Sequence, residues 1–285
     1  KFILADLEYG YANMQKTQWS TQWKGRVTAW AARALEAKVL LYMASGANFM
    51  ENGKAIGGKT WNDVKTVTDD VINNGPYSLY TAKNDSSFFY LFRCEAENCD
   101  ESIFEVQNGA SKSYGDINRC AYAVYRWVRG DNDNGGGWGL DVPTDGLVAD
   151  WQKRTDDTIR FHASIAFRGD KLSDGTTVGG LTELSGTNAG KPGYPPARYS
   201  MKAYVPKKDQ TQLSWIYGIE QNIRLLRFSD ILLIDAEAKF NLGDKDGARI
   251  SINKVRNRVK ETPYANSDLS LQNIWDERRF ELAFE

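Results

Sequence analysis

The chain has 285 residues, with 36 Lys and Arg against 37 Asp and Glu, so its formal net charge is −1. This balance excludes the strongly basic surface that most nucleic-acid-binding proteins use. Hydrophobic residues make up 41% and aromatic residues 12% of the chain, which is enough for a large core and unlike a disordered composition. No apolar run approaches the roughly 18 residues of a membrane span, and the run Ile231–Ile234, for example, stops at Asp235. We therefore expect one large folded domain, or two closely associated ones, without a transmembrane helix.

The first 75 residues are predicted to form stacked helices. Two stripes of apolar residues repeat at helical spacing: Ile3, Leu7, Tyr11 and Met14, then Ala31, Leu35, Val39 and Tyr42. The second helix is rich in alanine, which lets a neighbouring helix approach closely, and Gly46 is placed to end it. A third helix begins at the capping-box pattern of Thr60 and Asp63 and stops at Gly75-Pro76.

A second group of helices is predicted near the end of the chain. Its apolar stripes are Leu225, Phe228, Leu232 and Ala236, then Ala248, Ile252, Val255 and Val259, with a further helix from about Leu271. Gly243 separates the first two, and Pro263 follows the second. Helix hairpins of this size resemble tetratricopeptide units. The helical pattern starts abruptly at Phe2 and continues to Glu285, so we expect a fragment of a longer protein that lacks its N-terminal region and extreme C-terminus.

The middle of the chain has a different composition. Residues 108–220 contain 16 of the 25 glycines, and the alternating run Ile103–Val106 just before them predicts a short strand. Long loops of this kind are uncommon in compact domains unless they serve a function. We predict a mainly α fold of tetratricopeptide-like hairpins: a helical part with the first hairpin at 1–107, a loop-rich ligand-binding insert with a few short strands at 108–220, and C-terminal hairpins at 221–285.

The segment Gly53–Thr60 matches the phosphate-binding pattern G-x-x-x-x-G-K-[ST]. The run Ile231–Asp235 consists of four apolar residues followed by an acid. In P-loop enzymes, the acid of this pattern is a magnesium ligand. A P-loop works only where a buried strand feeds it, and residues 47–52 follow an alanine-rich helix instead. We interpret Gly53–Thr60 as a turn between two helices, and a P-loop ATPase is the enzyme alternative.

Other candidate chemistry is weak. The single histidine, His162, has no nucleophile motif and no second histidine for a zinc pair. The run Asp131–Gly135 begins like a calcium loop but lacks the closing glutamate. The adjacent acids Asp156 and Asp157 are expected to cap or pair structurally, although no sequence argument excludes a glycosidase pair among 37 acids. We predict no catalytic residue, no metal and no cofactor.

The three cysteines are Cys94, Cys99 and Cys120. They lack the C-x-x-C spacing of zinc or redox sites, and three are too few for a disulfide scaffold. The sequence does allow a disulfide between Cys94 and Cys99.

The glycine-rich middle carries aromatic residues interleaved with polar ones. A sugar ring presents an apolar C–H face that stacks on an aromatic ring, while its hydroxyls need polar partners at the rim. Charged or glycine neighbours flank three of the rings, and polar residues lie nearby in the sequence. We predict Tyr125, Trp127 and Trp138 as exposed stacking rings, with Arg119, Asp131 and Asn132 at the rim. For any one ring, packing of loops onto helices is the structural alternative.

Several motifs, spread in order over nearly the whole chain, resemble the SusD/RagB family of nutrient-binding outer-membrane lipoproteins from Bacteroidetes. They are Gly25-Arg26-Val27-Thr28 with Val39–Tyr42, then Gly137-Trp138-Gly139 followed by Pro143-Thr144, Asp157 and Arg160. The most specific are Asn222 with Arg224–Leu233 and Ala236-Glu237-Ala238, then Ile252-Asn253 with Val255-Arg256 and Arg258, and lastly Glu277–Leu282.

The resemblance implies a helical scaffold that holds a loop-rich, oligosaccharide-binding face and docks on a SusC-like TonB-dependent transporter. It implies binding without catalysis at the extracellular face of the outer membrane, with a lipid anchor upstream of this sequence as the membrane attachment. The charged residues Arg224, Arg227, Asp230, Arg278 and Glu281 would be paired scaffold residues. The alternatives to glycan binding are the P-loop ATPase and a protein-binding helical adaptor.

Overall fold

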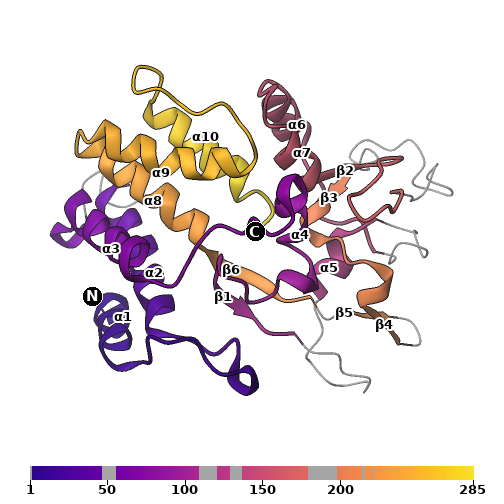
Figure 1. Ribbon diagram of the computed structural model, residues 1–285, viewed down its shortest axis with the longest axis horizontal. Helices are drawn as coiled ribbons and strands as arrows, with labels where there is room; N and C mark the ends of the chain where they lie inside the picture. Colours follow the sequence, from indigo (N-terminus) through magenta and orange to yellow (C-terminus); the bar gives the residue numbers. More distant parts are fainter. Residues whose placement is uncertain are drawn as a thin grey trace. The chain divides into compact units, whose positions relative to one another are not determined.

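The computed structural model describes residues 2–46, 56–108, 121–128, 137–178, 198–213, 216–219 and 221–285. The fold is mainly helical with short two-stranded sheets, which confirms the predicted class (Figure 1). The chain divides into two compact units. Unit 1 is Lys1–Tyr80, Asn98–Glu105 and Arg224–Leu282, and unit 2 is Thr81–Glu97, Val106–Ile223 and Ala283–Glu285.

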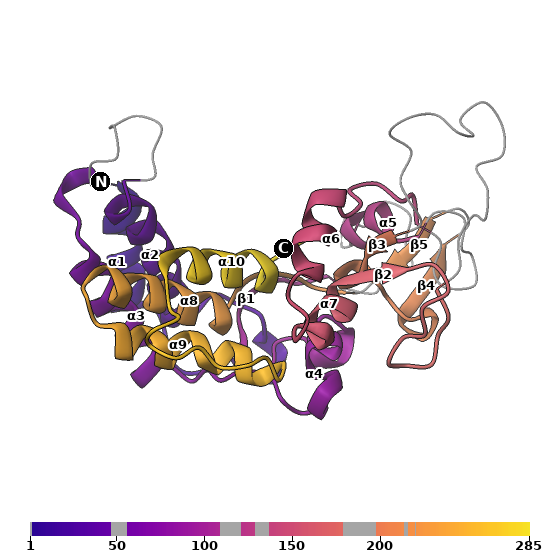
Figure 2. The ribbon, with the colours of Figure 1, turned by 90° about the horizontal axis from the view of Figure 1, so that it is seen from above.

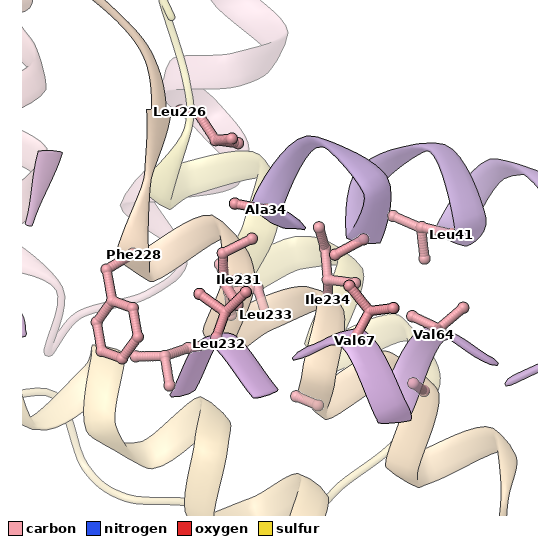
Figure 3. Close-up of a cluster of buried hydrophobic side chains, with 14 of the residues drawn as sticks. Ala34, Leu41, Val64, Val67, Leu226, Phe228, Ile231, Leu232, Leu233 and Ile234 are labelled. Atoms are coloured by element: carbon pink, nitrogen blue, oxygen red, sulfur yellow. The ribbon is translucent and has the colours of Figure 1, made fainter. Parts of the chain in front are cut away.

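Unit 1 is a stack of helices around α8 (Figure 2). Its helices are α1 (Phe2–Asn13), α2 (Ala29–Ala44), α3 (Trp61–Asn74), α8 (Phe228–Asn241), α9 (Lys245–Arg258) and α10 (Leu271–Glu281). Helix α8 packs against α2, α3, α9 and α10, while α1 packs against α2. Because α8 has neighbours on several sides, the run Ile231–Ile234 is buried completely (Figure 3). The helices predicted at both ends of the chain are therefore confirmed.

The buried face of α2 differs from the predicted one. Leu35 and Tyr42 of the predicted stripe are exposed, whereas Ala34 and Ala37 are fully buried in the core that α2 shares with α3 and α8 (Figure 3). A short alanine side chain lets the neighbouring backbones come close, and this packing outweighs the larger apolar area of leucine and tyrosine on the other face. The predicted close approach of helices is thus correct, and of the predicted stripe Ala31 and Val39 do face the core, whereas the prediction was wrong for Leu35 and Tyr42.

Local signals fix the helix ends in unit 1. The Asp63 carboxylate accepts hydrogen bonds of 2.8 Å from both the backbone N–H and the hydroxyl of Thr60, which caps α3 as predicted. Helix α3 stops before Gly75, and Gly46 follows α2 with φ of 59°, a left-handed conformation that glycine adopts without strain.

The strand β1 (Ser102–Val106) forms where the alternating run predicts it, and it pairs with β6 (Ile223–Arg227). The sequence stripe placed Leu225 at the start of a helix, and this prediction was wrong. Leu225 lies in β6 with its side chain exposed, and α8 begins only at Phe228. Pairing with β1, which is distant in the sequence, overrides the local helical spacing at this position.

Buried ion pairs tie the elements of unit 1 together. The Arg227 guanidinium lies 2.6 Å from the Glu101 carboxylate and 3.0 Å from that of Glu281. Arg258 contacts the same two acids, at 2.7 Å for Glu101. Nearby, Asp230 pairs with Lys38 at 3.2 Å and with Arg278 at 2.6 Å, and Arg224 lies 3.3 Å from Glu105. The predicted scaffold role of these charged residues is confirmed.

Unit 2 combines short helices with small sheets. Its helices are α4 (Ser87–Tyr90), α5 (Ala121–Arg126), α6 (Asp145–Gln152) and α7 (Thr158–Ser164), and the antiparallel pairs are β2 (Ile165–Phe167) with β3 (Arg198–Ser200) and β4 (Gln210–Leu213) with β5 (Ile216–Ile219). Short 3₁₀ turns complete the described fold: η1 (Thr21–Trp23) and η2 (Ile56–Gly58) in unit 1, and η3 (Asn84–Ser86), η4 (Cys94–Ala96), η5 (Met201–Ala203) and η6 (Lys207–Asp209) in unit 2. The prediction of loops with a few strands missed α5 to α7, because helices of only about two turns give no readable periodicity.

Asp157 organises the turn between α6 and α7. Its carboxylate accepts a 2.7 Å hydrogen bond from the Trp151 indole and pairs with Arg160 at 2.8 Å, and all three side chains are buried. The structural role predicted for this acid is confirmed.

Cys94 and Cys99 are not joined by a disulfide, and Cys120 lies outside the described residues. Among the helices that the structure describes, none combines the length and apolarity needed to cross a membrane.

Candidate functional site

Two exposed aromatic rings meet on unit 2. The ring centroids of Tyr125 and Trp138 lie 5.0 Å apart, and their planes are inclined at 55°. Tyr125 is 43% exposed and Trp138 is 51% exposed, so each ring leaves part of its surface open to solvent. Leu140, two residues beyond Trp138, is also exposed. We call Tyr125 and Trp138 the aromatic pair.

Backbone hydrogen bonds hold the aromatic pair in place. The chain from Gly137 to Leu140 runs beside the end of α5, where Leu140 N–H donates to the Tyr125 carbonyl at 2.7 Å and Gly139 N–H donates to the Trp127 carbonyl at 2.9 Å. Gly137 N–H donates to the Val128 carbonyl at 2.7 Å. Gly139 has φ of 64°, which turns the chain so that both bonds can form. The two rings are therefore positioned by backbone structure rather than by their own contact alone.

Trp127 does not belong to the exposed surface, so the prediction of an exposed ring there was wrong. It is 2% exposed and packs against Tyr204, with centroids 4.8 Å apart, and against Tyr199 at 6.3 Å. Two residues along a helical turn rotate a side chain by about half a turn, so Trp127 points inward where Tyr125 points outward. Burial raises the pKa of Tyr204, which keeps its hydroxyl neutral.

A charged group that sequence reasoning missed lies beside the aromatic pair. Asp141 follows Leu140 and forms a 2.7 Å ion pair with Arg126, and its side chain is more than half exposed. The Arg126 guanidinium lies over the Tyr122 ring at 4.0 Å and donates to the Phe284 carbonyl at 3.0 Å. These contacts fix Arg126 and leave oxygen atoms of Asp141 accessible to a ligand hydroxyl. Its place three residues after Trp138 is the sequence signal that could have identified it.

The predicted rim residues Arg119, Asp131 and Asn132 lie outside the described residues. Asp131 and Asn132 belong to residues 129–136, and the described residues at either end of that segment, Val128 and Gly137, are joined by the 2.7 Å backbone bond.

The phosphate-binding pattern has no matching structure in its described part. The Thr60 hydroxyl donates to Asp63, and the Lys59 ammonium group lies 3.7 Å from the same carboxylate. The acid of the companion motif, Asp235, is completely buried within α8, where it accepts hydrogen bonds from Thr68, Lys239 and Ser251. Helix α2 precedes the turn and α3 follows it, as the interpretation of a turn between helices requires. Residues 53–55 lie outside the described part.

In the part of the chain that the structure describes, the histidine and the acids do not form a metal site. His162 is exposed near the end of α7. Within the described ranges, no three residues among His, Cys, Asp and Glu gather as a metal site would require. The aromatic pair can bind a ligand through its exposed ring faces and the adjacent carboxylate oxygens of Asp141.

A sequence model of the SusD family matches residues 100–285, well over half of the chain. The chain belongs to the SusD family. The match covers the aromatic pair, the charged scaffold residues and helices α8 to α10. No curated protein matches this SusD-family chain in sequence.

Solved structures share the SusD-family fold over nearly the whole chain. A SusD-like protein from Bacteroides fragilis is 25% identical, with a TM-score of 0.72 over 100% of this chain and 57% of its own. Surface glycan-binding protein A from Bacteroides thetaiotaomicron, in complex with laminarihexaose, is 19% identical with a TM-score of 0.69 over 99% of this chain and 58% of its own. A structure with a xylogluco-oligosaccharide is 24% identical with a TM-score of 0.74 over 99% and 53%. The chain thus spans a little over half the length of the solved structures that it matches.

Proposed function

We propose that this SusD-family chain binds oligosaccharides at the aromatic pair and that the binding is not catalytic. The observation that carries the proposal is the exposed, backbone-held contact of Tyr125 with Trp138 on unit 2. Exposed aromatic rings that are fixed in place lose little conformational freedom when a ligand covers them.

The chemistry of the pair suits a sugar chain. A pyranose can lay its C–H face on one ring, and because the second ring is inclined at 55°, a neighbouring sugar unit can contact it at an angle. The exposed carboxylate of Asp141 can accept hydrogen bonds from sugar hydroxyls. Arg119, Asp131 and Asn132 remain proposed rim residues, and Trp127 supports the pair from inside through its backbone bond to Gly139.

The relatives support this choice of ligand. Two structures with the same fold contain laminarihexaose or a xylogluco-oligosaccharide, and the former is named a surface glycan-binding protein. We further propose that the chain acts at the cell surface, in the outer membrane through a lipid anchor, and passes its ligand to a SusC-like TonB-dependent transporter. Family membership supports these partners. Because these two structures carry different oligosaccharides, the test below uses a panel of glycans.

The test compares glycan binding by the wild type and Trp138→Ala. Native gels containing laminarin, xyloglucan or starch would identify a polysaccharide that retards the wild type, and calorimetry with its oligosaccharide would give the Kd. Covering about 60 Å² of ring face is worth about 1.5 kcal/mol, so loss of this ring should raise Kd about tenfold. Tyr125→Ala should have a similar effect.

The matched control is Trp23→Ala, which removes a comparably exposed tryptophan from unit 1. It should leave Kd unchanged, and all three variants should melt close to the wild type. Equal Kd values for wild type and Trp138→Ala would contradict the proposed site. Indifference of the wild type to every glycan, together with co-purification of a transporter, would instead favour a protein-binding adaptor.

A further inference from the structure

A second concave site lies on unit 2, apart from the aromatic pair. It is a cleft of about 440 Å³ between η3, α4, α7 and the hairpin that follows β2. Its volume is within the range of small-molecule sites, about 300–1,000 Å³. None of its lining residues belongs to the aromatic pair or to its neighbours Arg126 and Asp141.

The cleft is lined by an apolar wall and a polar rim. Buried apolar side chains, Phe89 of α4, Ala163 of α7 and Leu172 of the hairpin, form its inner wall. Exposed polar side chains surround them: Asp85, Thr158, His162, Lys171 and Ser173. A ligand that fills this cleft must offer an apolar face to the wall and several polar groups to the rim.

The hairpin that closes one side is well held. Asp170 accepts a 2.8 Å hydrogen bond from Phe167 N–H, and Leu172 N–H donates to the Thr176 carbonyl at 2.8 Å. The hydroxyl of the buried Tyr204 lies 2.9 Å from both Asp174 and Thr176, which fixes the tip of the hairpin. The cleft is thus formed before a ligand arrives, so that binding requires little ordering of the chain.

The charges of the rim select the type of ligand. Two carboxylates, of Asp85 and Asp170, border the same cleft as the Lys171 ammonium group and the His162 imidazole. Both carboxylates would repel an anionic ligand, and the Lys171 ammonium group would repel a cationic one. A neutral ligand with many hydroxyl groups can donate to the carboxylates and accept from Lys171 at the same time.

We propose that this cleft, the α4–α7 cleft, is a second binding site that takes a short neutral saccharide unit. The sugar would place a C–H face against Phe89 and Leu172 and its hydroxyls among Asp85, His162 and Lys171. This inference rests on the proposed glycan function, and it extends it from one site on unit 2 to two sites with different lining. A long glycan could then be held at two points, which strengthens binding through effective concentration.

The experiment uses His162 as a reporter, because it is the only histidine of the chain and lines the cleft. The ring resonances of His162 are followed by NMR during titration of the whole chain with glucose, cellobiose and laminaribiose, and with glucuronic acid and glucosamine as charged probes. A neutral sugar should shift these resonances in a saturable way, while the charged probes shift them less. The same titration should give the same curve in Trp138→Ala, which removes the aromatic pair but not the cleft.

Variants of the rim complete the test. Asp85→Ala and Lys171→Ala should each raise the Kd obtained from the titration about tenfold, which is the loss of affinity expected for one charge-assisted hydrogen bond. Lys254→Ala, a lysine exposed on α9 of unit 1, should leave it unchanged. Absence of a saturable shift with every neutral sugar, a response to the charged probes alone, or a response that disappears in Trp138→Ala would overturn the cleft proposal.

The two proposals fail separately. If glycan retardation still depends on Trp138 while His162 does not respond, only the cleft proposal is wrong. If no polysaccharide retards the wild type, the proposed function itself is wrong, whatever small molecules the cleft accepts.

Discussion

Tyr125 and Trp138 are separated by 13 positions in the sequence, and backbone hydrogen bonds link the segments that carry them, among them the bond from Leu140 N–H to the Tyr125 carbonyl at 2.7 Å. Their ring centroids consequently meet at 5.0 Å while both rings stay exposed. The geometry of this contact depends on the turn at Gly139, whose φ is 64°.

We expect Gly139→Ala to weaken glycan binding although it removes no ligand contact. A side chain at positive φ costs about 1–2 kcal/mol, and relief of that strain would move Trp138 away from Tyr125. Calorimetry should show a higher Kd, with a moderate fall in melting temperature. Gly243→Ala is the matched control, because Gly243 also has positive φ, at 83°, but lies in unit 1. It should lower the melting temperature and keep the wild-type Kd; a changed Kd in both variants would argue against a local effect.

The buried cluster of Arg227, Arg258, Glu101 and Glu281 should dominate the stability of unit 1. Arg227→Ala leaves two acids with one fewer cation in a dry environment, and the free energy of unfolding should fall by about 3–5 kcal/mol. Urea denaturation measures the change. Arg249→Ala breaks a 3.4 Å ion pair whose acid, Asp246, is exposed, so it should cost less than about 1 kcal/mol. Similar losses in the two variants would show that burial of the cluster matters little.

Thr60 should act as a helix cap and not as a magnesium ligand. Thr60→Ala removes the hydroxyl that donates to Asp63 and should lower the free energy of unfolding by about 1 kcal/mol. Thr60→Ser retains a hydroxyl and should stay near the wild type. Magnesium ATP should raise the melting temperature of none of these proteins. Nucleotide-dependent stabilisation that is lost in Lys59→Ala would restore the ATPase alternative.

Glu237 gives a pH dependence with a defined sign. Burial raises the pKa of this carboxyl, and the hydrogen bond from Trp275 at 3.0 Å and the charge of Arg278 oppose the rise. A raised folded-state pKa means that the contribution to stability is fully present below the unfolded-state pKa, about 4.3, and is lost as pH rises through the folded value. Glu237→Gln keeps an oxygen for the Trp275 indole and carries no charge. Its free energy of unfolding relative to the wild type should therefore be higher at pH 7 than at pH 4, as urea titrations at the two values would show. A relative stability that falls with pH would contradict the assigned cause.

Sequence alone determined the parts of this protein that depend on short-range signals. The capping pattern of Thr60 and Asp63 fixes the start of α3, because its partners lie within one helical turn. The alternation at Ile103–Val106 predicts β1 for the same reason. The order of the family motifs over nearly the whole chain also predicted a helical SusD-like scaffold with paired charges, and residues 100–285 match that family.

Only the tertiary structure decided which surfaces are buried. Leu225 has helical spacing with its neighbours but pairs as a strand with β1, and α2 buries its alanines because α1 and α3 pack closely against it. Tyr125 and Trp127 have similar neighbours in the sequence, yet one is exposed and the other is enclosed by Tyr199 and Tyr204. Burial is a property of the contacts that a side chain makes with distant parts of the chain, and these contacts exist only once the fold has formed.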